Sequence, residues 1–166
     1  WMPQTPTAEN VLEFNYFIGD ALVNVKYRDG RKNFKLYKGA EKVFYNIDSI
    51  AGHSWCVVVE GEMDVLALHE AGIENAISVP NGATLNTNNL DYLDNCIDYF
   101  IDMDKIVIAV DNDAAGEALK QEIVRRLGAE VCYIVDFGES KDANELLVAE
   151  GPDALMNAIG AASQVP

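Results

Sequence analysis

Acidic side chains follow apolar runs at two points in this sequence, in the segments 60–64 and 111–113, and a third acidic motif occupies 141–145. Carboxylates gathered in one place repel one another unless cations neutralise them, and hard oxygen ligands of this kind suit Mg²⁺ or Mn²⁺. Two such ions support displacement at phosphorus, one activating the attacking oxygen and one stabilising the leaving oxygen. The pattern therefore indicates phosphoryl or nucleotidyl transfer. The candidate metal ligands are Glu60, Asp64, Asp111, Asp113 and Asp142.

These acids need a scaffold that brings them together, and the apolar runs predict one. Strands are predicted over 56–59, 76–79, 106–110 and 131–135, with helices near 63–71, 89–101 and 114–127 and with Gly72 and Gly128 as helix C-caps. Buried strands that alternate with helices predict an α/β fold around a four-stranded, mainly parallel sheet. Parallel sheets bind ligands at the carboxyl ends of their strands. We therefore expect the three acidic motifs to converge on that edge.

The segment before this region has a different composition. The runs 11–18, 21–28 and 32–37, separated by turn residues at Gly19-Asp20 and Asp29-Gly30, predict a small antiparallel β meander. Seven of the twelve Lys and Arg residues fall between 26 and 42, where only two acids oppose them, which gives this window a net charge of +5. The whole chain carries a charge of -15, which taken alone argues against nucleic acid as a ligand. The sequence thus combines a basic N-terminal segment with an acidic body.

Length and composition bound the remaining possibilities. We divide the chain into an N-terminal basic β subdomain (1–52), an α/β domain (53–150) and a C-terminal helix and linker (151–166), and we interpret it as a piece of a longer protein. No apolar run approaches the ~18 residues of a membrane span and no signal peptide is evident, so we expect a cytoplasmic protein without a membrane partner. The three cysteines lie far apart in apolar contexts and are expected to be buried free thiols.

Most of the acids also have a purely structural explanation. Asp113 and Asp142 each precede a helical pattern and could be N-caps, and Asp64 and Glu62 could be first-turn acids that the helix dipole favours. For Glu62 we favour this explanation. Asp111 is harder to explain as scaffold, because one acid is enough for a cap. The stretch 111–122 also partly matches an EF-hand calcium loop, but a strand precedes it and Ala occupies its fifth, ligand position, so we reject that interpretation.

The three acidic motifs in this order, preceded by the basic stretch 26–34, resemble the TOPRIM domain of phage-type primase-helicases and of the related mitochondrial helicase. The resemblance covers roughly residues 14–150. It implies a TOPRIM fold in 53–150, preceded by part of a primase N-terminal region. By similarity, the catalytic residues would be Glu60, Asp111 and Asp113, with Glu60 as a metal ligand or general acid-base group and with Asp64 and Asp142 completing the metal site. Lys26 and Lys32 would contact nucleotide phosphates, and the small-residue loop 81–84 would lie near the site.

The resemblance further implies a DNA primase that makes short RNA primers for DNA replication. A ribonucleotide 3′-hydroxyl would attack the α-phosphate of a second nucleotide on a single-stranded DNA template, with two Mg²⁺ or Mn²⁺ ions and ribonucleoside triphosphates as substrates. The sequence has no cysteine pairs for a zinc ribbon and no G-x-x-x-x-G-K-[ST] helicase motif, so these domains would lie outside this chain.

Three alternatives stay open at this point. A TOPRIM topoisomerase or nuclease would use the same acids, and a non-catalytic module would bind metal without turnover. A Mg²⁺-dependent phosphatase or phospho-acceptor domain would place Asp111 at a strand end for phosphorylation. Against the phosphatase, Ala115 stands where that family usually has threonine.

Overall fold

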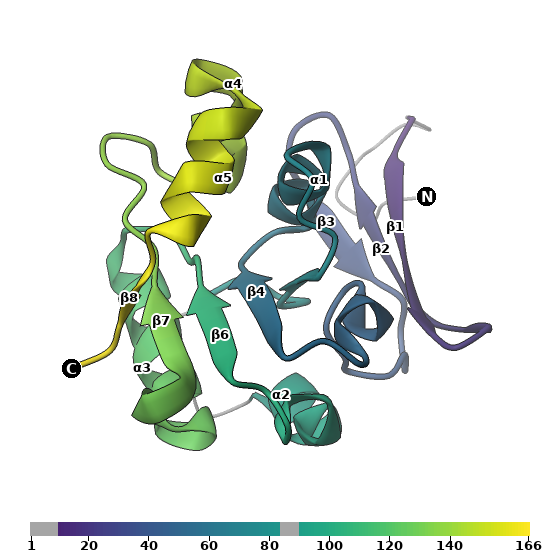
Figure 1. Ribbon diagram of the computed structural model, residues 1–166. Coiled ribbons are helices and arrows are strands. Elements are labelled where there is room, and N and C mark those ends of the chain that lie inside the picture. The colour runs from purple at the N-terminus through teal and green to yellow at the C-terminus, as the bar shows by residue number, and fades with distance from the viewer. Residues whose placement is uncertain (1–9, 84–89) are drawn as a thin grey trace.

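The computed structural model describes residues 10–83 and 90–166. Within these residues the chain forms two β-sheets, a small antiparallel one and a larger, mainly parallel one that is flanked by helices (Figure 1). The described segments include no helix with the length and apolar character needed to cross a membrane. The fold class expected from the sequence, an α/β sheet preceded by a β meander, is confirmed.

The antiparallel sheet is the predicted meander and has the strand order β1-β2-β3. Its strands are β1 (Leu12–Ile18), β2 (Ala21–Arg28) and β3 (Phe34–Leu36). The turn predicted at Asp29-Gly30 is a longer loop over 29–33, because the Asp29 carboxylate accepts hydrogen bonds from the N–H groups of Arg31 (2.9 Å) and Asn33 (2.8 Å). Lys32 stands inside this loop with a φ of 62°. The Asp29 side chain therefore fixes the backbone from which Lys32 projects.

The larger sheet has the strand order β5-β4-β6-β7-β8. Its strands are β4 (Trp55–Val59), β5 (Ala76–Ser78), β6 (Lys105–Ile108), β7 (Cys132–Ile134) and β8 (Ser163–Gln164). The first four pair in parallel, as predicted. The last strand, β8, pairs antiparallel with β7 and was not predicted, because two residues are too short to show a strand period.

Helices connect and cover the parallel strands. They are α1 (Glu62–Glu70), α2 (Asp91–Asn95), α3 (Ala114–Leu127), α4 (Ala143–Glu150) and α5 (Pro152–Gly160), with 3₁₀ turns at 47–50, 97–100 and 129–131. Gly128 is the C-cap of α3, as predicted, whereas the C-cap of α1 is Ala71 and Gly72 follows it. The φ values of Gly72 and Gly128, 89° and 98°, favour glycine. The helical segment predicted near 89–101 is present but is not one continuous helix. Residue 89 lies outside the described residues, and the helical segment breaks at the buried Cys96 into α2 and a 3₁₀ turn.

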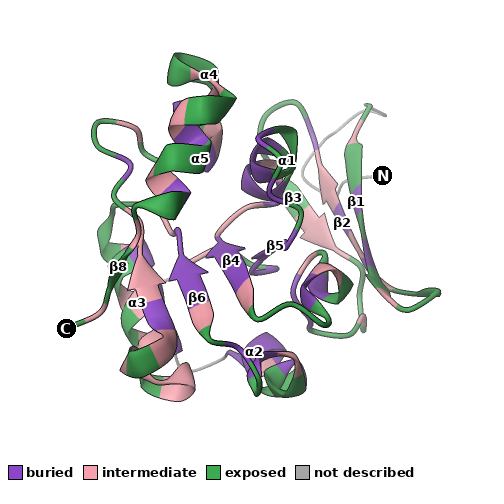
Figure 2. Ribbon diagram, in the orientation of Figure 1, coloured by how far each residue is buried: buried purple, intermediate pink, exposed green. Residues whose placement is uncertain are grey.

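The hydrophobic core lies on both faces of the parallel sheet (Figure 2). Because strand side chains alternate, Val57 and Val59 of β4 pack with α1, α4 and α5, whereas Cys56 and Val58 pack on the opposite side with α3. Phe14 and Tyr16 of β1 pack in the same cluster as Cys56 and Val58, so the meander shares its core with the parallel sheet. This shared core holds the meander beside the edge where β4 and β6 end. The three cysteines are buried and free, as expected.

Candidate metal and nucleotide site

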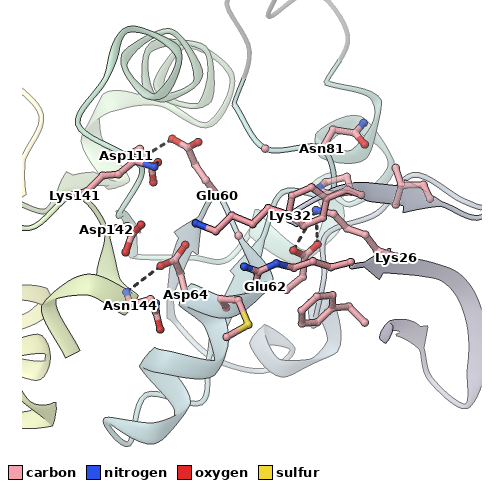
Figure 3. A pocket seen from close by; sticks show the side chains of 18 residues that line it. Lys26, Lys32, Glu60, Glu62, Asp64, Asn81, Asp111, Lys141, Asp142 and Asn144 are labelled. Atoms are coloured by element: carbon pink, nitrogen blue, oxygen red, sulfur yellow. Dashed lines mark hydrogen bonds and ion pairs between the residues drawn. The ribbon is translucent and has the colours of Figure 1, made fainter. Parts of the chain in front are cut away.

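A cleft of about 570 Å³ lies where the carboxyl ends of the parallel strands face the meander. Acids line it from the parallel sheet and its helices, and basic residues line it mainly from the meander (Figure 3). The lining acids are Glu60, Glu62, Asp64, Asp111 and Asp142, and the lining basic residues are Lys26, Arg28, Lys32 and Lys141. The three acidic motifs therefore meet at one edge of the sheet, together with the basic stretch.

Glu60 is the first residue after β4 and lies between two loops. Its Oε1 accepts a hydrogen bond from the Asp111 N–H (2.8 Å) and its Oε2 accepts one from the Ala83 N–H (3.2 Å). Burial and the nearby Asp111 charge raise the pKa of Glu60 despite these hydrogen bonds. Asn81 and Gly82 line the cleft, whereas Thr84 of the predicted small-residue loop lies outside the described residues.

Asp64 projects from the first turn of α1 and is only 8% exposed. Its Oδ1 accepts a hydrogen bond from the Asn144 N–H at 3.0 Å, which ties α1 to the start of α4. Burial, together with the charges of Asp142, Asp111 and Glu60, raises the pKa of Asp64 to about 7 despite the Asn144 hydrogen bond. The cleft therefore carries a negative field that disfavours a further unpaired carboxylate and favours a bound cation.

Asp111 already has a cationic partner. The Lys141 Nζ lies 2.8 Å from Asp111 Oδ2, while the Lys141 side chain remains 62% exposed. This pairing raises the pKa of Lys141. Sequence reasoning assigned Lys141 no separate role, although it directly precedes Asp142 in the third acidic motif, and that position was the available signal.

The capping explanation applies to both acids for which it was considered. Asp113 Oδ1 accepts a hydrogen bond from the Gly116 N–H (2.8 Å) and Asp142 Oδ1 accepts one from the Glu145 N–H (2.8 Å). Asp142 nevertheless lines the cleft, so capping does not remove it from the site. Asp113 is exposed and lines a neighbouring cavity of about 540 Å³ that also includes Asp111. The EF-hand interpretation stays rejected because α3 already begins at Ala114.

Glu62 differs most from the sequence-based interpretation. It does lie in the first turn of α1, but it is only 3% exposed. Its Oε1 lies 2.8 Å from the Nζ of Lys26, and Lys26 is itself only 7% exposed. Tyr16 also donates a hydrogen bond to Glu62 Oε1 at 2.5 Å, and burial raises the Tyr16 pKa. Glu62 is thus a first-turn acid, as interpreted, but it also forms a buried ion pair that this interpretation did not include. Sequence periodicity missed the pair because Lys26 and Glu62 belong to elements that pack only in the folded chain.

The carboxylates of the cleft suit a hard divalent cation. They offer oxygen donors only. Burial and mutual repulsion raise the pKa values of Glu60 and Asp64, and positive charge would relieve the repulsion. No group of three or more acidic, His or Cys side chains in the described parts of the chain already stands at metal-binding spacing. Binding of an ion would therefore require side-chain rotation among these acids.

Comparison with known proteins shows which family the chain resembles. A family model described as Toprim-like matches residues 57–147, more than half of the chain. The primase homolog protein of Arabidopsis thaliana is 39% identical over 95% of the chain, and its Twinkle homolog protein, chloroplastic/mitochondrial, is 38% identical over 95%. The chain spans 52% of the first relative and 25% of the second.

A solved structure gives the same fold. The primase fragment of the bacteriophage T7 primase-helicase protein superimposes with a TM-score of 0.77 at 24% identity, covering 89% of this chain and 62% of that one. The resemblance drawn from the acidic motifs and the basic stretch is thereby confirmed.

Proposed function

The chain belongs to the Toprim-like family, and from this premise we propose that it is the catalytic domain of a DNA primase. In this proposal it joins ribonucleotides into short RNA primers on single-stranded DNA by metal-dependent nucleotidyl transfer. The similarity to a primase homolog protein and to a bacterial DNA primase supports this choice among the alternatives.

The observation that carries the proposal is a single cleft with two chemically different walls. Carboxylates at the ends of β4 and β6 form one wall, and the cations of β2 and the 29–33 loop form the other. A reaction between two nucleotides needs both, because the triphosphates require cations and the metal ions require acids. The acids alone indicate phosphoryl or nucleotidyl transfer, and the basic wall favours a nucleoside triphosphate as the substrate.

The acids of the cleft would hold Mg²⁺ or Mn²⁺, in our proposal as a pair of ions. Glu60, Asp64, Asp111 and Asp142 line the cleft, and Asp113 stands two residues from Asp111 as a further candidate. When bound, such ions supply charge neutralisation at phosphate oxygens and activation of the attacking oxygen.

The remaining side chains would bind and position the nucleotide. Lys32 and Lys141 present ammonium groups to the cleft and suit phosphate oxygens as mobile point charges. Lys26 keeps its proposed phosphate contact, but its Nζ would make that contact while held by Glu62. Glu60 keeps its proposed role as a metal ligand or general acid-base group, with Asp111 and Asp113 as the other catalytic residues.

The activity of a whole primase also needs parts beyond this site. Because the chain spans only part of its relatives, the single-stranded DNA template, the zinc ribbon and the helicase enter as proposed partners. The division at residues 52 and 150 and the cytoplasmic location also remain predictions.

The test is oligoribonucleotide synthesis on single-stranded DNA by the full-length protein that carries this chain, with Mg²⁺ or Mn²⁺. Asp111→Asn should lower product formation by roughly a hundredfold or more, because metal-assisted charge stabilisation is worth several kcal/mol. Asp153→Asn, which changes an exposed acid in the first turn of α5, serves as the control. Undiminished synthesis by Asp111→Asn would reject the catalytic assignment.

A further inference from the structure

The basic wall of the cleft is one face of the antiparallel sheet. Alternate side chains of a strand point to the same face, so Lys26 and Arg28 of β2 share a face, as do Phe34 and Leu36 of β3. The strand register sets Arg28 opposite Phe34 and Lys26 opposite Leu36, and all four residues line the cleft. The basic stretch therefore delivers an aromatic ring to the cleft together with its cations.

Phe34 is 46% exposed although it lines a cleft. The Lys26 Nζ lies 4.9 Å and the Arg28 Cζ 5.9 Å from the centroid of its ring. These contacts are favourable cation–π interactions and they set cations around the ring. An accessible ring combined with neighbouring positive charge is the arrangement by which proteins stack nucleobases while they bind the attached phosphates.

The cleft has one end suited to the phosphates of a nucleoside triphosphate and another suited to its base. Lys32 extends from the side of the antiparallel sheet towards Glu60 and Asp64 (Figure 3). The cleft volume of about 570 Å³ falls in the range of ~300–1,000 Å³ that small-molecule sites occupy. A triphosphate directed towards the acids would leave its base on the side of the antiparallel sheet.

We propose that Phe34 is a stacking platform for the base of a nucleoside triphosphate whose phosphates contact Lys32 and the metal ions that the acidic wall would hold. The inference rests on the proposed function and adds a base subsite to it. Stacking requires only an aromatic face, so this subsite accepts any of the four bases.

The experiment measures calorimetric binding of two probes to the 166-residue chain in the presence of Mn²⁺. ATP carries a base, whereas inorganic tripolyphosphate presents only the phosphates. Phe34→Leu should weaken ATP binding roughly tenfold and leave tripolyphosphate binding unchanged. Phe34→Tyr should bind both probes as the unaltered chain does, because it keeps the ring. Tyr37→Leu, which removes an exposed aromatic ring just beyond β3, is the matched control and should change neither affinity.

Two results would overturn the subsite. One is ATP binding by Phe34→Leu that equals that of the unaltered chain. The other is an equal loss for ATP and tripolyphosphate, which would show that the substitution disturbs the phosphate site or the fold. If the unaltered chain binds neither probe, the proposed function fails together with the inference, and this outcome is distinct from the first two.

Discussion

Glu62 and Lys26 form a buried ion pair between α1 and β2, at the wall of the cleft. Moving two charges out of water costs several kcal/mol each, and their mutual attraction offsets this only when the remaining polar groups are also satisfied. Tyr16 supplies one such hydrogen bond, from its hydroxyl to Glu62 Oε1. The pair joins the basic sheet to the segment that carries Glu60 and Asp64, so it couples the positions of the two walls.

Glu62→Gln should lower the free energy of unfolding by about 3–5 kcal/mol. The amide can still accept the Tyr16 hydrogen bond, but Lys26 would stay buried without a counter-charge. Urea denaturation gives the difference. Glu70→Gln, at the exposed end of the same helix, should stay within roughly 0.5 kcal/mol of the unaltered chain. Equal stability of Glu62→Gln and Glu70→Gln would show that the pair is not maintained in solution.

At the level of single residues, the sequence identified the acids but not their partners. Glu60, Asp64, Asp111 and Asp142 line the cleft as the strand-end argument required. The pairing of Asp111 with Lys141 joins residues 30 positions apart, and no local period relates them. Partners of this kind follow from packing, which sequence patterns do not specify.

The first turn of α3 lies directly against Glu60 and Asp111. A Cβ atom on Gly116 would fall 2.1 Å from the Asp111 carbonyl oxygen and 2.8 Å from Glu60 Oε1. The glycine therefore permits the helix to start where Asp113 can cap it while Glu60 still reaches the Asp111 N–H. The close approach of α3 to the ends of β4 and β6 therefore brings Glu60 and Asp111 together.

Gly116→Ala should destabilise the chain by about 1–3 kcal/mol, because a backbone carbonyl cannot move aside cheaply. Thermal denaturation should show this as a melting temperature lowered by several degrees. Gly160→Ala is the control, since a Cβ there meets nothing within 4 Å. Melting of both variants at the same temperature would mean that α3 can shift without cost.

A helix or strand could be predicted where its segment was long enough to show a hydrophobic period. The four parallel strands, α1, α3 and the meander follow from apolar runs and turn residues. The strand β8 could not be predicted because two residues are too short to show a period. The break at the buried Cys96 could not be predicted because no glycine or proline marks it. The 29–33 loop departs from a simple turn because the Asp29 side chain satisfies its N–H groups.

For the whole molecule, the charge of -15 is less informative than its arrangement. Repulsion among the acids of the cleft, added to burial, raises the pKa of Asp64 to about 7. The folded chain therefore binds a proton at Asp64 more tightly than the unfolded chain does, and this contribution to stability is lost as pH rises through about 7. The sequence predicted convergence of the acids, but this protonation depends on burial that no motif reveals.

In chelator, Asp64→Asn should become stabilised relative to the unaltered chain as pH rises from about 5 to about 8. The asparagine has no charge to bury, whereas Asp64 must ionise over this interval. Because one pKa unit corresponds to about 1.4 kcal/mol, the difference should reach a few kcal/mol at most. Melting curves of both proteins across this pH range give the result, and a difference that stays constant with pH would refute the raised pKa.

The measurement that tests the metal site most directly is a Mn²⁺ titration of the chelator-treated chain, followed by its melting temperature. The melting temperature should rise with Mn²⁺, because an ion bound only by the folded state stabilises it. The double variant Asp64→Asn/Asp111→Asn should show no rise above its own metal-free value, while Asp153→Asn should rise like the unaltered chain. A rise of full size in the double variant, or no rise in the unaltered chain, would contradict the assignment of the cleft acids as a metal site.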